Sequence, residues 1–164
     1  SVCCIPLRFY FDAIGTLSDF SYHEDAGKSM DNRWMHRPRL DWERAARRRQ
    51  AGTPEFRIFT ALRRLISLRK EIPAFADHNN RELHVLDNPS LFVFSRFDPR
   101  HGSPRILVAA NFALDTQQLP LAPLKQQGFF RSGNARDIAS DETLRCDGHS
   151  LVIASRSFLW LRDA

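Results

Sequence analysis

The sequence is poor in cysteine and in long apolar runs. Only Cys3, Cys4 and Cys146 occur among its 164 residues, and no C-x-x-C pair is present. Two adjacent Cys residues cannot easily bond to each other, so we expect no disulfide framework and a reducing compartment. No apolar run reaches about 18 residues and no charged-then-apolar leader occurs, so we expect no membrane span, no signal peptide and a cytoplasmic location.

Several signatures of catalytic or cofactor chemistry are also missing. The six His residues show neither H-x-H nor H-x-x-x-H spacing, which argues against a metal site. No Ser lies in a G-x-S-x-G setting, so a serine nucleophile has no support. We found no internal repeat and no low-complexity tract, and we expect no cofactor and no metal.

The charge is strongly basic. The formal net charge is +5 and the pI about 9.6, with Arg far more frequent than Lys. Clustered Arg, as in the run from Arg44 to Arg49, can neutralise the phosphates of a nucleic acid. No helix-turn-helix, zinc finger or aromatic-plus-basic platform accompanies the cluster, however. We therefore interpret it as a solvated helix face and expect no nucleic-acid partner.

The length limits the fold. With 43% hydrophobic residues the chain can form one or two small cores. It is too short for a complete (β/α)8 barrel, which takes about 250 residues.

The N-terminal half predicts a strand, a long connection and two helices. Residues 2–10 form an apolar run of strand length. The polar connection Asp12–Arg39 exceeds about 12–15 residues, a length typical of functional or disordered loops. Asp41 can cap a short helix from Trp42 to about Gln50. Thr53-Pro54 then predicts the start of a longer helix, which should end near Glu71.

From Arg81 the sequence predicts strands without intervening helices. Turn residues separate short β-rich segments, which suggests an antiparallel sandwich. The expected strands are Leu83–Leu86, Leu91–Phe97, Arg105–Phe112, Gln117–Leu119, Ala135–Ile138, Leu151–Ala154 and Ser157–Arg162. The aromatic residues Phe92, Phe94, Phe97 and Trp160 should belong to the sandwich core. We place the domain boundary at residues 76–80.

The stretch Asp31–Pro38 holds the densest group of polar and aromatic side chains in the sequence. Two guanidinium groups, those of Arg33 and Arg37, flank the indole of Trp34. Arg can hold a carboxylate or the oxygens of a sugar through a planar fork, and Trp offers a flat face for a sugar ring. Pro38 should end any helical tendency at Arg37, so we expect an ordered loop. The alternative is a surface loop whose Arg side chains pair with nearby acids.

This stretch and the residues before it resemble the last barrel strand and following loop of amylosucrases and bacterial sucrose hydrolases, of the α-amylase superfamily (glycoside hydrolase family thirteen). The family pattern is I-P-L-I-Y-x-G-D-E-[IV]-G-x-L-N-D followed by D-[SN]-R-W-x-H-R-P-R. The matching positions are Ile5-Pro6-Leu7, Asp12, Ile14-Gly15-Thr16-Leu17, Asp19, Lys28, Arg33-Trp34 and Arg37-Pro38-Arg39. Weaker similarity covers the rest of the chain, which corresponds to the C-terminal quarter of such an enzyme.

The N-terminal dozen residues fit the family least. Arg8 stands where a buried strand needs an apolar residue, and Phe11 and Ala13 replace the Gly and Glu that flank Asp12 in the family. Cys3-Cys4 take the place of a Gly-Gly turn. These departures suggest that this segment is degraded, truncated or not packed in a barrel.

The resemblance implies an α+β architecture: residues 1–75 would form the last βα unit of a (β/α)8 barrel, and residues 81–164 a C-terminal antiparallel β-sandwich. The parent would be a cytoplasmic bacterial glucosyltransferase or hydrolase that acts on sucrose and α-glucans with retention, through a glucosyl-enzyme. Its catalytic Asp and Glu come from earlier strands, so no catalytic residue is expected here. Arg33 would bind substrate, and Asp12, Trp34, His36 and Arg37 would support it.

Two other classes stay open at this point. The chain could be a stand-alone carbohydrate-binding or structural β-sandwich module, for which a planar row of exposed aromatic side chains would be the mark. An Arg-rich nucleic-acid binder would instead show an affinity that falls steeply with salt.

Overall fold

The computed structural model describes residues 10–76, 79–100 and 102–164. They belong to two compact units, Leu7–Ile66 and a second unit that contains Ser67–Ala164, and each is described by itself. The two compact units meet between Ile66 and Ser67, within a helix. The boundary expected at residues 76–80 separates domains that would fold independently, which the compact units do not test, so it stays a prediction. Across the described part of the chain, no helix combines the length and apolar character needed to cross a bilayer.

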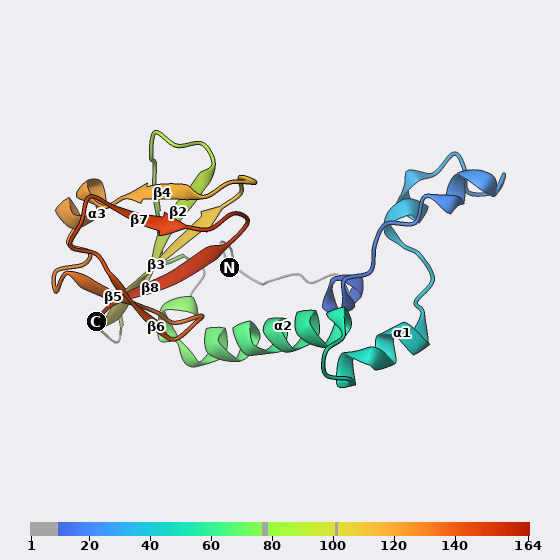
Figure 1. The fold of residues 1–164 in the computed structure, drawn as a ribbon, viewed down its shortest axis with the longest axis horizontal. Coiled ribbons are helices and arrows are strands. Elements are labelled where there is room, and N and C mark those ends of the chain that lie inside the picture. Colours follow the sequence, from blue (N-terminus) through green and yellow to red (C-terminus); the bar gives the residue numbers. More distant parts are fainter. Residues whose placement is uncertain (1–9, 77–78, 101) are drawn as a thin grey trace. The chain divides into compact units, whose positions relative to one another are not determined.

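In the first unit, short helices and turns precede the start of one longer helix (Figure 1). The 3₁₀ helix η1 (Tyr10–Ile14) overlaps the start of the long connection Asp12–Arg39, and two more, η2 (Ser21–Glu24) and η3 (Asn32–His36), lie within it. Helix η3 falls in the stretch Asp31–Pro38, which the sequence predicted to be an ordered loop. Helix α1 (Trp42–Ala46) follows and continues into η4 (Arg47–Arg49). The predicted strand at residues 2–10 falls outside the described residues except for Tyr10.

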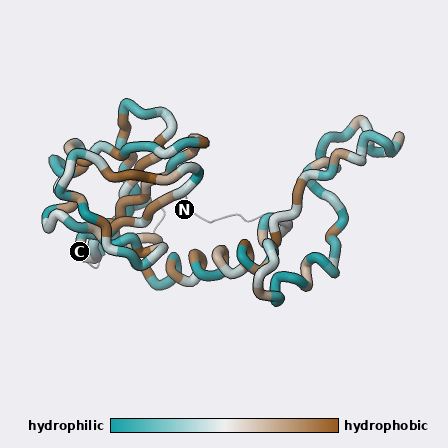
Figure 2. The backbone as a smooth tube through the Cα atoms, viewed as in Figure 1, coloured by the Kyte–Doolittle hydropathy of each residue, from teal (hydrophilic) through white to brown (hydrophobic). Residues whose placement is uncertain are grey.

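Helix α2 (Pro54–Glu71) begins and ends where the sequence predicted. The Thr53 hydroxyl accepts a hydrogen bond from the Phe56 amide (3.2 Å), and Pro54 occupies the first helical position, where its missing N–H costs nothing. Ile72-Pro73 ends the helix, and the short helix η5 (Pro73–Phe75) follows. Along α2, hydrophobic and hydrophilic residues alternate in Figure 2.

The second unit carries two antiparallel sheets, one of six strands in the order β1-β2-β3-β8-β5-β6 and one formed by β4 and β7. No barrel occurs among the described residues. The strands are β1 (Arg81–His84), β2 (Leu91–Asp98), β3 (Ser103–Asn111), β4 (Gln117–Pro120), β5 (Asn134–Asp137), β6 (Glu142–Arg145), β7 (Ser150–Ile153) and β8 (Phe158–Asp163). Helix α3 (Ala122–Gln126) follows β4.

One hydrophobic cluster joins both sheets and α3. It includes Val93 and Leu107 of the large sheet, Leu119 and Ile153 of the small sheet, and Leu124 of α3, all essentially buried. Burying each such side chain contributes about 1.5–3 kcal/mol. The two sheets are therefore held to each other by a shared apolar core, and the central strands are hydrophobic in Figure 2.

The opposite face of the large sheet has its own aromatic cluster. Phe94, Val108 and Trp160 lie in one cross-strand row. Phe75 of η5 packs on this row, with its ring centroid 4.9 Å from that of Trp160. Phe94 and Trp160 are thus buried, as predicted, but they pack against η5 rather than within the cluster between the two sheets.

Three details of the predicted secondary structure were wrong. The first strand lies two residues earlier than expected, because Leu83 and Val85 are exposed and the chain leaves the sheet after His84 toward a turn at Asn88. Strand β6 was missed because most of its side chains are polar and exposed. Helix α3 was missed because five residues that include a Pro give no helical period.

Candidate functional site

The connection between η1 and α1 is ordered by aspartate side chains that accept hydrogen bonds from the backbone two residues further on. Asp19 accepts from the Ser21 amide (2.9 Å), Asp25 from the Gly27 amide (2.9 Å) and Asp31 from the Arg33 amide (3.0 Å). Such turns are a local property of Asp. They explain how a polar segment with almost no buried side chain adopts a defined path.

A backbone contact joins the two arms of this connection. The amide of Asp19 donates to the carbonyl of Met35 (2.8 Å), so the residues just after η1 lie beside η3. The Ser21 hydroxyl also donates to Asp19 (2.6 Å). This bond and the one from the Ser21 amide hold the pKa of the Asp19 carboxyl below its ordinary value.

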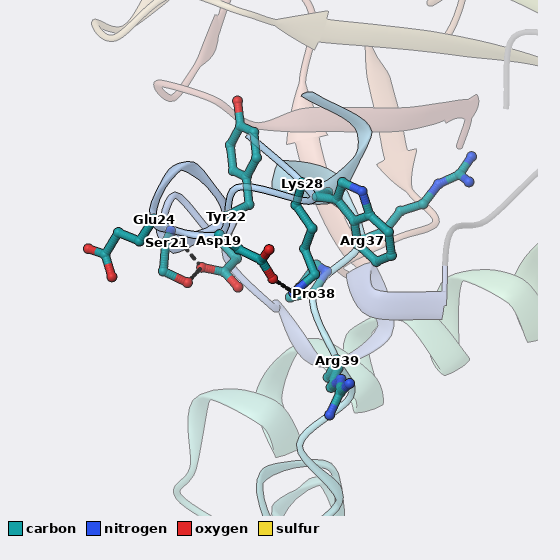
Figure 3. A pocket seen from close by; sticks show the side chains of 10 residues that line it. Asp19, Ser21, Tyr22, Glu24, Lys28, Arg37, Pro38 and Arg39 are labelled. Carbon is teal, nitrogen blue, oxygen red and sulfur yellow. Dashed lines mark hydrogen bonds and ion pairs between the residues drawn. The ribbon is translucent and has the colours of Figure 1, made fainter. Parts of the chain in front are cut away.

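Between the arms lies a concavity of about 530 Å³ within the Leu7–Ile66 unit (Figure 3). Its lining mixes carboxylates, cations, hydroxyls and one indole: Asp19, Ser21, Tyr22, Glu24, Asp25, Lys28, Trp34, Arg37, Pro38 and Arg39. The wall of this concavity therefore combines charged and hydroxyl-bearing side chains with one indole face.

Trp34 is the aromatic group in this lining that has a large exposed surface. It is 44% exposed, and the ammonium of Lys28 lies 5.6 Å from its ring centroid. Lys28 also pairs with Asp25 (2.5 Å). The cation is thereby fixed beside the indole, and part of the ring surface stays accessible to a ligand.

Arg33 does not line the concavity. Its Nε donates to both oxygens of Asp31 (2.8 and 3.0 Å) and its Nη2 to Oδ2 (2.7 Å). These bonds lower the pKa of Asp31 to about 2, and the same pairing raises the pKa of Arg33. The Arg33 side chain is 73% exposed. The pair is what the surface-loop alternative expects, although Nη1 has no hydrogen-bond partner in the described part of the chain and could donate to a ligand.

The structure thus brings together two of the five predicted site residues. Trp34 and Arg37 line the concavity, whereas Arg33, Asp12 and His36 do not. Asp12 and His36 are exposed, and the backbone carbonyl of Asp12 accepts from the Gly15 amide (3.3 Å).

Sequence reasoning missed several lining residues, among them Ser21, Tyr22, Glu24 and Asp25. The spacings D-x-S at Asp19 and D-x-G at Asp25 are turn signals that could have shown where the chain reverses. Nothing in the sequence indicated that Tyr22 would be the buried side chain of η2.

The arginine cluster after Asp41 is partly used inside the unit. Arg44 pairs with Glu55, and Arg48 donates to the Ala45 carbonyl (2.6 Å) and lies over the ring of Phe59. Arg47 and Arg49 are exposed. At least two of the four side chains therefore have partners within the unit, and the absence of a nucleic-acid partner stays a prediction.

The described residues contain no group of three or more His, Cys, Asp or Glu side chains that could hold a metal ion. No protein-family model matches the sequence.

Proposed function

We propose that the chain is the C-terminal portion of an amylosucrase-like or sucrose-hydrolase-like enzyme of the α-amylase superfamily. In this proposal residues 2–10 are the eighth strand of a (β/α)8 barrel, the connection Asp12–Arg39 is the loop that follows it, and α2 is the last barrel helix. The two antiparallel sheets form the C-terminal β-sandwich domain. The positions and bounds of α2 and of the strands after Arg81 support this order of elements.

In the proposed parent, a carboxylate attacks the glucosyl carbon of sucrose while a second carboxylic acid protonates the leaving fructose. The glucosyl-enzyme then passes its glucose to an α-glucan or to water. Both acids belong to earlier barrel strands, so this chain contributes binding and not bond cleavage. No cofactor takes part in that reaction.

The observation that carries the proposal is the loop from Asp19 to Arg39. It combines the motif R-W-x-H-R-P-R with a concavity whose wall includes a half-exposed indole, carboxylates and hydroxyls. An aromatic face that stacks on a sugar ring, with charged groups that hydrogen-bond its hydroxyls, is the chemistry that carbohydrate recognition requires.

Arg33 is the residue we assign to the sugar itself. Asp31 occupies Nε and Nη2 and so fixes the guanidinium, which reduces the entropy lost when the remaining nitrogen, Nη1, donates a hydrogen bond to the sugar. Trp34 and Arg37 would form the wall beside it, and Asp12 and His36 would support the backbone of the loop.

Two experiments test this function. The reading frame upstream of the Ser1 codon is expected to encode barrel strands with a catalytic Asp and Glu, and an unrelated upstream frame would contradict the proposed parent. In calorimetric titrations with sucrose and a short α-glucan, Arg33→Ala should weaken binding about tenfold, the loss expected for a hydrogen bond to a charged group. Arg49→Ala, which removes the same charge from an exposed position, is the control. Equal affinities of the two variants for the sugar would show that Arg33 does not bind it.

The runner-up, a stand-alone carbohydrate-binding or structural module, depends on a planar row of exposed aromatic residues. Phe94 and Trp160 are buried, and Phe92 and Phe97 are half-buried. The sheet therefore offers no such row from these four residues, and the loop is the better candidate for a sugar site.

A further inference from the structure

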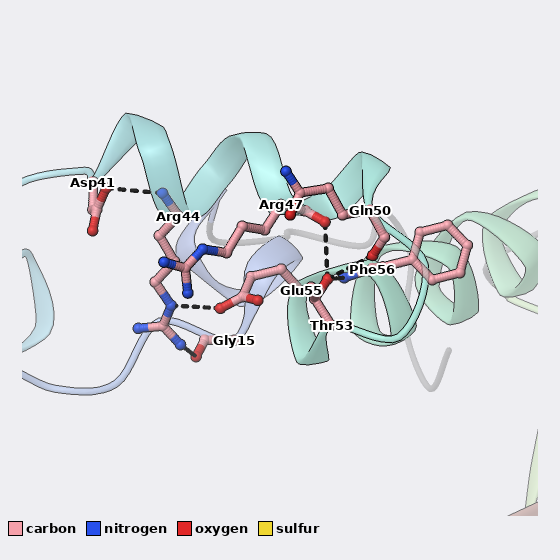
Figure 4. Close-up of polar contacts among 8 residues, drawn as sticks. All are labelled: Gly15, Asp41, Arg44, Arg47, Gln50, Thr53, Glu55 and Phe56. Atoms are coloured by element: carbon pink, nitrogen blue, oxygen red, sulfur yellow. Dashed lines mark hydrogen bonds and ion pairs between the residues drawn. The ribbon is translucent and has the colours of Figure 1, made fainter.

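Arg44 bonds to both ends of the loop that carries the concavity. Its Nη2 donates to the Gly15 carbonyl (3.1 Å), where the loop begins. Its backbone amide donates to the Asp41 carboxylate (2.9 Å), where the loop ends and α1 begins (Figure 4). Arg44 thus bonds to both ends of the 27-residue segment Gly15–Asp41, and all of these groups lie in the Leu7–Ile66 unit.

Glu55 fixes the guanidinium of Arg44. The Nε of Arg44 donates to Glu55 Oε1 (2.7 Å), and Glu55, in the first turn of α2, is only 3% exposed. Its other oxygen, Oε2, is buried without a hydrogen-bond partner among the described residues. A buried carboxylate is costly unless a cation and hydrogen bonds compensate it, so Arg44 is needed at this position. The bond from Arg44 also holds the pKa of Glu55 below its ordinary value, which keeps the carboxylate ionised.

The beginning of the loop has no room to shift toward α2. Ala13 and Ile14 are buried, and Gly15 has a φ of +64°, a conformation that favours glycine. A Cβ on Gly15 would lie 2.4 Å from Cδ1 of Ile58 in the next turn of α2. Gly15 is therefore held by the side chain of Ile58 and by the hydrogen bond from Arg44 to its carbonyl.

Gly15 is connected to the lining of the concavity through only a few residues of backbone. Four residues later the Asp19 amide donates to Met35, the neighbour of Trp34. Asp19 and Trp34 both line the concavity. A shift of Gly15 would consequently move one arm of the concavity relative to the other.

We propose that Arg44 is a positioning residue: it closes the loop between Gly15 and Asp41 and thereby sets the geometry of the concavity, while Glu55 holds the guanidinium in place. Arg44 does not touch the ligand. The assignment of this role to sugar binding depends on the proposed function, but the closing of the loop does not.

Hydrogen exchange measured by mass spectrometry tests the inference without any ligand. Arg44→Ala should raise exchange in residues 16–39 about tenfold or more, the effect expected when hydrogen bonds to a charged group are lost. Exchange in β2 and β3 should not change, which shows that the sheet unit is still folded. Arg44→Lys should restore little of the lost protection, because a single ammonium cannot reproduce the hydrogen bonds that the guanidinium donates to Glu55 and to the Gly15 carbonyl. Arg49→Ala should behave like the wild type.

A double variant separates positioning from the simple cost of leaving Glu55 without its cation. Arg44→Ala with Glu55→Gln removes the buried charge, so protection of α2 should return while residues 16–39 stay unprotected. Full recovery of protection in residues 16–39 would overturn the proposal, and so would rapid exchange of this segment in the wild type. A wild type that fails to bind sugar but shows the predicted exchange would contradict the proposed function and leave the role of Arg44 intact.

Discussion

Asp31 and Arg33, two residues apart, form a bidentate ion pair in which Nε and Nη2 of Arg33 both reach the carboxylate of Asp31. The same carboxylate accepts the backbone amide of Arg33 (3.0 Å) and caps η3. One side chain thus caps the start of η3 and orients a guanidinium. The loop supplies its own partner for Arg33, independently of any acid from elsewhere.

This pair predicts an unusually acidic aspartate. The hydrogen bonds from Arg33 lower the pKa of Asp31 from 3.8 to about 2. When a carboxyl has a lower pKa in the folded state than in the unfolded state, it stabilises the fold at every pH above its unfolded-state pKa. This stabilisation is lost as the pH falls through the folded-state pKa. The pair should therefore persist down to about pH 2. NMR titration of the Asp31 carboxyl carbon should show this pKa, and Arg33→Gln should return it toward 3.8.

Arg37→Gln is the matched control for that titration. Arg37 acts on Asp31 only through its charge, and it lowers the pKa less than Arg33 does, so its removal should change the midpoint far less. An Asp31 that titrates near 3.8 in the wild type would show that the ion pair does not form in solution.

Asn111 should be the most sensitive polar position of the sheet unit. It is buried, its amide donates to the carbonyls of Asp115, Ile153 and Ala154, and its Oδ1 accepts from Ala113. Asn111→Ala should lower the free energy of unfolding by about 2–4 kcal/mol, since each hydrogen bond contributes about 1 kcal/mol and buried carbonyls lose their donors. The denaturant midpoint measures this. Gln126→Ala, at an exposed position of α3, should stay within about 0.5 kcal/mol of the wild type.

Cys146 should be chemically inert in the folded protein. It is fully buried, and burial is the main cause that raises the pKa of its thiol to about 11. The thiolate is the reactive form, so alkylation at pH 8 should be slow in the native state and fast after unfolding. Mass spectrometry of the peptide that contains Cys146 distinguishes it from Cys3 and Cys4. Native alkylation as fast as in the unfolded chain would contradict the burial of this side chain.

The isolated chain should not turn over sucrose. In the proposed parent both reacting carboxylic groups come from strands that precede this segment, so the purified protein should release no glucose or fructose above a buffer control. Turnover that persists through stringent repurification would contradict the assignment of this chain to the C-terminal portion of such an enzyme.

The parts of the fold that the sequence predicted well are those with local signals. Thr53-Pro54 and Ile72-Pro73 delimit α2 because capping and proline geometry act on neighbouring residues. The runs at β2 and β3 are strongly apolar and were placed to within two residues. Strand β6 carries no such signal, because it lies at the edge of the sheet with mostly exposed polar side chains.

The candidate site was only partly predictable for the same reason. The Asp31–Arg33 pair spans two residues and was anticipated as one alternative. The Arg44–Glu55 contact spans 11 residues and the Arg44–Gly15 contact 29, and no pattern in the sequence marks either. Such contacts depend on how η1, α1 and α2 pack, which periodicity does not specify.

The most direct test of the carbohydrate assignment is a tryptophan fluorescence titration with sucrose and with a short α-glucan. Trp34 lines the concavity, Trp42 is 76% exposed and does not line it, and Trp160 is buried in the sheet unit. The account predicts a saturable change in emission for the wild type and for Trp42→Phe, and its loss in Trp34→Phe. A saturable change that survives in Trp34→Phe, or no saturable change in the wild type with either sugar, would contradict it.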